Sequence, residues 1–191
     1  MDAWNTSIIN EFYHEAELGI PLLPHFALPG EGTGAPLSLL LEMRQLAGSP
    51  IRVLLVDPHQ MCRDAMARLI GEAAAVQISA SADSGAEAVR MCRDNAPDVV
   101  VMATELEDAD AMEVTAEILG VSQQTEVILM QRSCDESVAI RAIQSGALGL
   151  VSTRAPVSGL VEAIHTVAQG RPYLGPIALD AVTKRLASIT G

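Results

Sequence analysis

Acidic side chains gather directly after an apolar run in the middle of the chain. Five consecutive apolar residues run from Val99 to Ala103, and Asp98 precedes them. The acids that follow this run are Glu105, Glu107, Asp108 and Asp110. A short apolar run of this kind is typical of a strand buried on both faces of a parallel sheet, and ligands bind where such strands end. Chemistry is therefore expected at this corner, yet the strand ends on Ala103, whose methyl group cannot react.

Other residue types that often carry chemistry show no pattern of a site. The four histidines are dispersed without the i, i+4 spacing of metal ligands, at His14, His25, His59 and His165. The three cysteines lack CxxC spacing and are interpreted as idle thiols, at Cys62, Cys92 and Cys134. The segment Gly30–Gly34 does not follow a strand and lacks the GK[ST] ending of a phosphate loop. The sequence therefore predicts no metal ion, no cofactor and no enzyme.

Composition indicates a soluble cytoplasmic protein of about one domain. The chain has 191 residues, of which 49% are hydrophobic and 19% are charged, and this excludes disorder throughout. No apolar run is long enough to cross a membrane, and the start of the chain shows no secretory signal. The net charge of −12 leaves no basic surface for nucleic acid. We therefore expect neither membrane insertion nor direct DNA contact.

From Ile51 onward, apolar runs of strand length alternate with helical patterns. Strands are predicted over 52–57, 76–81, 99–103, 126–130 and 148–152, each followed by a helix. Pro58 is expected at the first helical position, and Ser84 with Glu87 and Asp110 with Glu113 have capping-box spacing. Five alternations predict an α/β fold, a doubly wound five-stranded parallel sheet with right-handed crossovers.

Residues 1–49 differ from the rest and are predicted to form a helical N-terminal extension. They contain four of the five aromatic residues of the chain, Trp4, Phe12, Tyr13 and Phe26. Helices are predicted over about 6–17 and 38–46, separated by prolines and glycines. One interpretation is an arm folded back on its own domain, and the other is an aromatic-anchored contact with a partner.

Four segments, taken together, resemble the receiver domain of two-component response regulators. They are Ile51–Asp57, Pro97–Met102, Ala142–Leu150 and Gly170–Pro176, and the last two are similar to the NarL/LuxR-type subfamily. The resemblance implies a flavodoxin-like (βα)5 receiver over residues 50–175, with 176–191 as a C-terminal linker or helix. It also implies transfer of a phosphoryl group from a histidine kinase to an aspartate. That chemistry needs a carboxylate nucleophile, acids that hold Mg²⁺, a cation and a hydroxyl.

The resemblance gives each of these roles a position, and most positions hold a residue that cannot perform the role. The unsuited residues are Ala103 for the acceptor aspartate, Pro58 for the second acid, Gln131 for the hydroxyl and Thr153 for the lysine. Asp57 matches the first of the paired acids. Arg154 follows the lysine position, but strand alternation is expected to point it to the other face. The resemblance therefore implies a degenerate pseudo-receiver that lacks the phosphoacceptor aspartate.

The predicted function is a phosphorylation-independent module that controls transcription or signalling through protein contacts, as the regulatory part of a LuxR-type transcription factor. The expected partner is another protein or a second copy of the chain, met through the acidic loop Glu105–Asp110 or through the face of the fourth helix, fifth strand and fifth helix. Residues expected on that face are Arg141, Gln144, Val157, Leu160 and His165. DNA would be reached only through a helix-turn-helix domain absent from these residues. The alternatives are a small-molecule sensor and an adaptor that uses its N-terminal arm.

Overall fold

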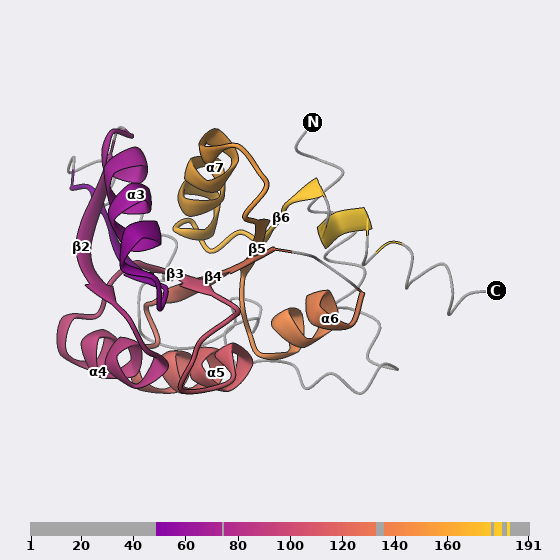
Figure 1. Cartoon of the computed structure of the whole chain (residues 1–191), viewed down its shortest axis with the longest axis horizontal. Coiled ribbons are helices and arrows are strands. Elements are labelled where there is room, and N and C mark those ends of the chain that lie inside the picture. The colour runs from indigo at the N-terminus through magenta and orange to yellow at the C-terminus, as the bar shows by residue number, and fades with distance from the viewer. Residues whose placement is uncertain (1–48, 74, 133–135, 177, 181–182, 184–191) are drawn as a thin grey trace, which may run out of the picture.

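A computed structural model describes residues 49–73, 75–132, 136–176, 178–180 and 183. The described residues form a parallel sheet with the strand order β2-β1-β3-β4-β5-β6 (Figure 1). The strands are β1 (Ile51–Val56), β2 (Val76–Ala82), β3 (Val99–Ala103), β4 (Glu126–Gln131), β5 (Gly149–Ser152) and β6 (Tyr173–Leu174). The helices are α3 (Gln60–Gly71), α4 (Gly85–Asn95), α5 (Ala111–Val121), α6 (Glu136–Gln144) and α7 (Val157–Val167). The predicted α/β fold is confirmed.

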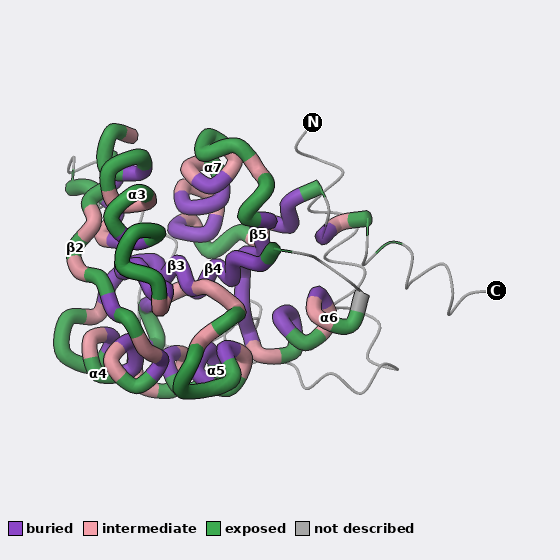
Figure 2. The backbone as a smooth tube through the Cα atoms, in the orientation of Figure 1, coloured by how far each residue is buried: buried purple, intermediate pink, exposed green. Residues whose placement is uncertain are grey.

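Helices cover both faces of the sheet, as right-handed crossovers between parallel strands require. Helices α3 and α7 lie on one face, and α4, α5 and α6 lie on the other (Figure 1). Alternate residues of each central strand enter the two cores: Val100 and Met102 pack on the α4–α5 side, and Val99 and Val101 on the α3–α7 side. The buried segments of Figure 2 therefore follow the central strands and the inner faces of the helices.

The sheet has one strand more than the sequence predicts. Tyr173 and Leu174 form β6, which pairs in parallel with Gly149 and Leu150 of β5. Two residues are too few to show any periodicity, so no sequence pattern marks this strand. Because of β6, strand β5 does not lie at the edge of the sheet. Leu174 is 7% exposed and belongs to the core.

Helix α3 begins two residues later than predicted. Pro58 was expected at the first helical position, but the helix starts at Gln60 with His59 as its N-cap. The reason is local: the Asp57 Oδ1 accepts the backbone N–H of His59 at 2.8 Å and closes a turn before the helix. Pro58 lies within that turn and not in the helix.

The two ends of the chain differ in how far the structure describes them. The N-terminal extension, with its anchors Trp4, Phe12, Tyr13 and Phe26, lies outside the described residues and stays a prediction. After β6, residues 176, 178–180 and 183 are helical, as one of the two alternatives for this segment proposed. Among the described residues, no helix has the length and apolarity that a membrane span needs.

Candidate functional site at the carboxyl edge of the sheet

The register of the sheet brings the sequence-predicted pocket positions to one edge. Strands β1, β3, β4 and β5 are neighbours and run in parallel, so their carboxyl ends lie side by side. Asp57 follows β1, Ala103 ends β3, Gln131 ends β4, and Thr153 follows β5. The edge thus holds the residues that the resemblance assigned to the pocket. Its chemistry now depends on what each side chain contacts.

Asp57 is largely buried and tied to the turn that opens α3. Its Oδ1 lies 3.0 Å from the Nδ1 of His59, in addition to accepting that residue's backbone N–H. The guanidinium of Arg63, itself buried, donates to the backbone carbonyl of Asp57 at 2.6 Å. Asp57 is therefore a carboxylate held in one position by its own turn.

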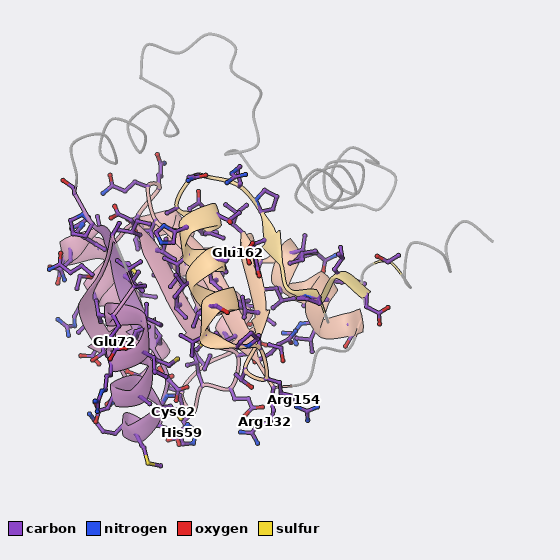
Figure 3. All side chains as sticks on the ribbon, turned by 90° about the horizontal axis from the view of Figure 1, so that it is seen from above. His59, Cys62, Glu72, Arg132, Arg154 and Glu162 are labelled. Carbon is purple, nitrogen blue, oxygen red and sulfur yellow. The ribbon has the colours of Figure 1, made fainter. Side chains whose placement is uncertain are left out.

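The same turn brings together donors that the sequence analysis judged to be scattered. Ligand atoms of Asp57, His59 and Cys62 all lie within 4.8 Å of one another. Cys62 is exposed on the first turn of α3, beside His59 (Figure 3). The spacing of the histidines alone does not reveal this group, because its members are of three residue types. The signal that was available is the spacing Asp-x-His-x-x-Cys at a helix start.

Gln131 is buried at the end of β4 without a partner for its side chain. It is 3% exposed, and neither its Nε2 nor its Oε1 has a hydrogen-bond partner among the described residues. Its backbone carbonyl accepts the N–H of Thr153, which links β4 to the turn after β5. A buried amide of this kind costs free energy unless a polar group reaches it.

The acidic loop after β3 supplies caps for two helices. The Asp108 carboxylate accepts the backbone N–H groups of Gly85 and Ala86 at 3.0 and 3.1 Å, at the start of α4. These two backbone hydrogen bonds, with that of Gly85 the larger effect, lower the pKa of Asp108. Ser84 and Glu87 do not form the predicted capping box, because the Ser84 side chain makes no cap hydrogen bond.

Asp110 has the capping role that the sequence predicts for it. Its carboxylate accepts the N–H of Met112 at 2.8 Å at the start of α5, and it also pairs with Arg141 of α6. The Met112 hydrogen bond, followed by the Arg141 hydrogen bond, lowers the pKa of Asp110. Two of the four loop acids are thus engaged in holding helices.

Two arginines lie at the same edge as the acids. Arg132 follows β4 and pairs with Glu105 at 3.8 Å, with both side chains mostly exposed. Arg154 lies in the turn beyond β5, which ends at Ser152, so the argument from strand alternation does not apply to it. Figure 3 shows Arg154 beside Arg132, on the side of the molecule where His59 and Cys62 also lie. The edge therefore carries cations, although Thr153 replaces the lysine.

The predicted contact face is divided by the extra strand. Arg141 and Gln144 are exposed on α6, Val157 is 38% exposed at the start of α7, and His165 is half-buried. Leu160 packs in the core on the α3–α7 side and does not belong on a contact surface. Strand β6 covers the side of β5 that was expected to lie between the two helices.

Comparisons with known proteins agree with this fold. The family model described as "Response regulator receiver domain" matches residues 53–165, more than half of the chain. The chain is 30% identical over 126 residues to the response regulator GacA of Pseudomonas viridiflava, covering 66% of this chain and 59% of that protein. It is also 30% identical to the response regulator UvrY of Escherichia coli, over 65% of this chain and 57% of that protein. The chain thus spans less than two thirds of these relatives.

Solved structures give the same result. A LuxR-family response regulator of Aurantimonas sp. SI85-9A1 is 29% identical and superposes with a TM-score of 0.68, over 72% of this chain and 99% of that one. The receiver domain of NarL from Mycobacterium tuberculosis is 25% identical, with a TM-score of 0.62, over 64% of this chain and 99% of that one.

Replacing Asp108 with alanine should destabilise the fold through the loss of the α4 cap. We expect Asp108→Ala to lower the free energy of unfolding by about 1 kcal/mol at neutral pH. Because the folded state lowers the pKa of Asp108, this stabilisation is present above the unfolded pKa and is lost as the pH falls through the folded value. The difference between the two proteins should therefore shrink in acid. Urea denaturation at neutral pH and near pH 3 measures both effects.

Glu107→Ala is the matched control, because Glu107 is an exposed neighbour in the same loop. It should unfold at the same urea concentration as the unmodified chain. Equal midpoints for the two variants would contradict the capping role of Asp108.

Proposed function

The chain belongs to the response regulator receiver domain family, and from this premise we propose that it is a receiver that regulates through protein contacts without being phosphorylated. The observation that carries the proposal is the end of β3. There the resemblance places an acceptor aspartate, and this chain has Ala103. An alanine methyl group cannot attack phosphorus, so the expected aspartyl phosphate has no atom to form on.

The other pocket positions support the same proposal. Pro58 replaces the second acid, so a divalent ion loses an oxygen ligand. Thr153 replaces the lysine and is exposed. Asp57 is present, but it follows β1 rather than β3, and its Oδ1 is already bonded to His59. Asp57 is the one carboxylate among these pocket positions. It is therefore the residue to test for phosphorylation at a site other than position 103.

Treatment with acetyl phosphate and Mg²⁺ should leave the chain unmodified. The reason is that the strand that should carry the nucleophile ends in a methyl group. Intact-mass spectrometry should show no added phosphoryl group, and Asp57→Asn should give the same spectrum as the unmodified protein. A receiver with an aspartate at the end of its third strand, treated in parallel, controls for the reagent. A hydroxylamine-sensitive phosphoryl adduct that disappears in Asp57→Asn would refute the proposal.

We place the output of this receiver at protein contacts made on the α6–β6–α7 side. Val157 is one of three large apolar side chains that are exposed among the described residues, and it lies at the start of α7. Arg141 and Gln144 are exposed on α6, and a surface that offers both apolar and polar side chains suits a protein contact. The partner that we propose is a second copy of the chain. The longer relatives further support a role as the regulatory part of a LuxR-type transcription factor, in which a separate domain contacts DNA.

Placing a charge at Val157 should weaken self-association. We expect Val157→Glu to raise the dissociation constant of the dimer at least tenfold, a loss of about 1.4 kcal/mol, because a carboxylate would be buried at the contact. Sedimentation equilibrium of the full chain measures this constant. Leu69→Glu is the matched control, since Leu69 is 47% exposed on α3, away from this surface. Equal dissociation constants for the two variants would place the contact elsewhere.

Gln131 favours one second candidate, a small-molecule sensor. The pocket edge offers a buried amide without a partner and two nearby arginines, Arg132 and Arg154. A small anion with hydrogen-bonding atoms would satisfy the amide and be attracted by the guanidinium groups. Such a ligand would bind the folded state and shift the balance between two conformations or two oligomeric states.

Gln131→Leu separates the two candidates. Removing a buried polar group that lacks a partner should raise the melting temperature of the free protein, because such a group costs roughly 1–3 kcal/mol. If the sensor function is correct, small anionic metabolites raise the melting temperature of the unmodified chain but not of this variant. Gln124→Leu, at an exposed turn position, should change neither value. A lower melting temperature for free Gln131→Leu would show that the amide is satisfied.

A further inference from the structure

A carboxylate, an imidazole and a thiol meet at the turn between β1 and α3. The ligand atoms of Asp57, His59 and Cys62 all lie within 4.8 Å of one another. This set differs from the site that the family resemblance implies, since Mg²⁺ binds oxygen atoms and has little affinity for sulfur or imidazole. Oxygen, nitrogen and thiolate donors together suit zinc and its neighbours in the first transition row.

The backbone of this turn places all three side chains on the same side. The N–H of His59 bonds to the Asp57 carboxylate, and the N–H groups of Cys62 and Arg63 both bond to the His59 carbonyl at 3.1 Å. His59 and Cys62 are three residues apart at a helix start, and residues at that spacing are neighbours on a helix surface. The buried guanidinium of Arg63 donates a hydrogen bond to the backbone carbonyl of Asp57 and so stabilises the turn. The donor atoms of His59 and Cys62 at the helix start therefore lie close to the Asp57 carboxylate without an ion.

We propose that this turn binds one transition-metal ion of the zinc class through Asp57, His59 and Cys62, with water as the fourth ligand. In a tetrahedral site with zinc-ligand lengths, neighbouring donor atoms lie about 3.4–3.6 Å apart. The carboxylate and imidazole atoms are already 3.0 Å apart. The His59 side chain is 64% exposed and Cys62 is exposed, so small side-chain rotations complete the geometry and solvent supplies the ion. As the ion binds, the Cys62 thiol releases its proton to water.

The other described cysteine does not compete for the ion. Cys92 is fully buried in α4, and burial raises the pKa of its thiol to about 12, so the thiolate ligand is not available there. Cys134 lies outside the described residues and serves as a control in the experiment. The site does not depend on the proposed function, because phosphorylation and metal binding are measured separately.

Titration of the full chain with Co²⁺ tests the proposal directly. One equivalent should produce the thiolate-to-metal charge-transfer band and the strong visible bands of a tetrahedral ion, and Zn²⁺ should abolish them. Cys62→Ser should remove the charge-transfer band, and His59→Gln and Asp57→Asn should each weaken binding at least tenfold. Cys134→Ser and Asp64→Asn, the latter an exposed acid on the same helix, should bind as the unmodified chain does.

A second measurement uses the unmodified chain and so does not depend on how the variants fold. Zn²⁺ should slow alkylation of Cys62 at least tenfold, with the modified cysteine identified by peptide mass mapping, while the same concentration of Mg²⁺ should have no effect. Absence of the charge-transfer band overturns the proposal. A band that persists in Cys62→Ser and disappears in Cys134→Ser also overturns it, as does alkylation of Cys62 that zinc leaves unchanged.

Discussion

The central strand β3 pairs with a parallel neighbour on each side, and this pairing determines where every side chain of the candidate site lies. Met102 aligns with Val56 of β1 and with Leu129 of β4, and the residues from Val99 to Met102 are completely buried. A shift of one residue would send each apolar side chain from one core to the other. The two cores therefore hold Ala103, Asp57 and Gln131 at the same edge, whatever chemistry those residues have.

The acids of the loop after β3 have a structural role at that edge that does not depend on its chemistry. Asp108 and Asp110 each accept backbone N–H groups at the start of a helix, where a carboxylate is favoured by the helix dipole. Glu105 pairs with Arg132 across the edge. An interpretation of this loop as a mere solvated surface overlooks these bonds. Two of its acids join neighbouring helices to the loop. They therefore contribute to the stability of the fold, whether or not the loop also contacts a partner.

The fold was predictable because the buried strands β1, β3, β4 and β5 are short, mostly apolar runs separated by helical patterns. The edge strand β2, VQISASA, carries a weaker signal because it is only partly buried. Strand β6 was not predictable, since Tyr173 and Leu174 are ordered by pairing with β5 and show no periodicity of their own. The positions of the residues at the carboxyl edge of the sheet were harder to predict, because they too depend on local contacts and not on periodicity. The position of Arg154 could not be predicted from strand alternation because β5 stops at Ser152. Helix α3 starts late because a side-chain hydrogen bond to Asp57 competes with the helix.

The residue types at this edge determine which ions it favours. With aspartate at position 103 and an acid at position 58, Asp57 would belong to an all-oxygen set that suits Mg²⁺. With Ala103 and Pro58, Asp57 turns instead toward His59, and Cys62 lies within reach of both. The exposed imidazole and thiol contribute little to the cores, so their presence requires no change in the packing that holds β3. The proposed metal site thus has softer donors than the all-oxygen set that the resemblance implies for this edge.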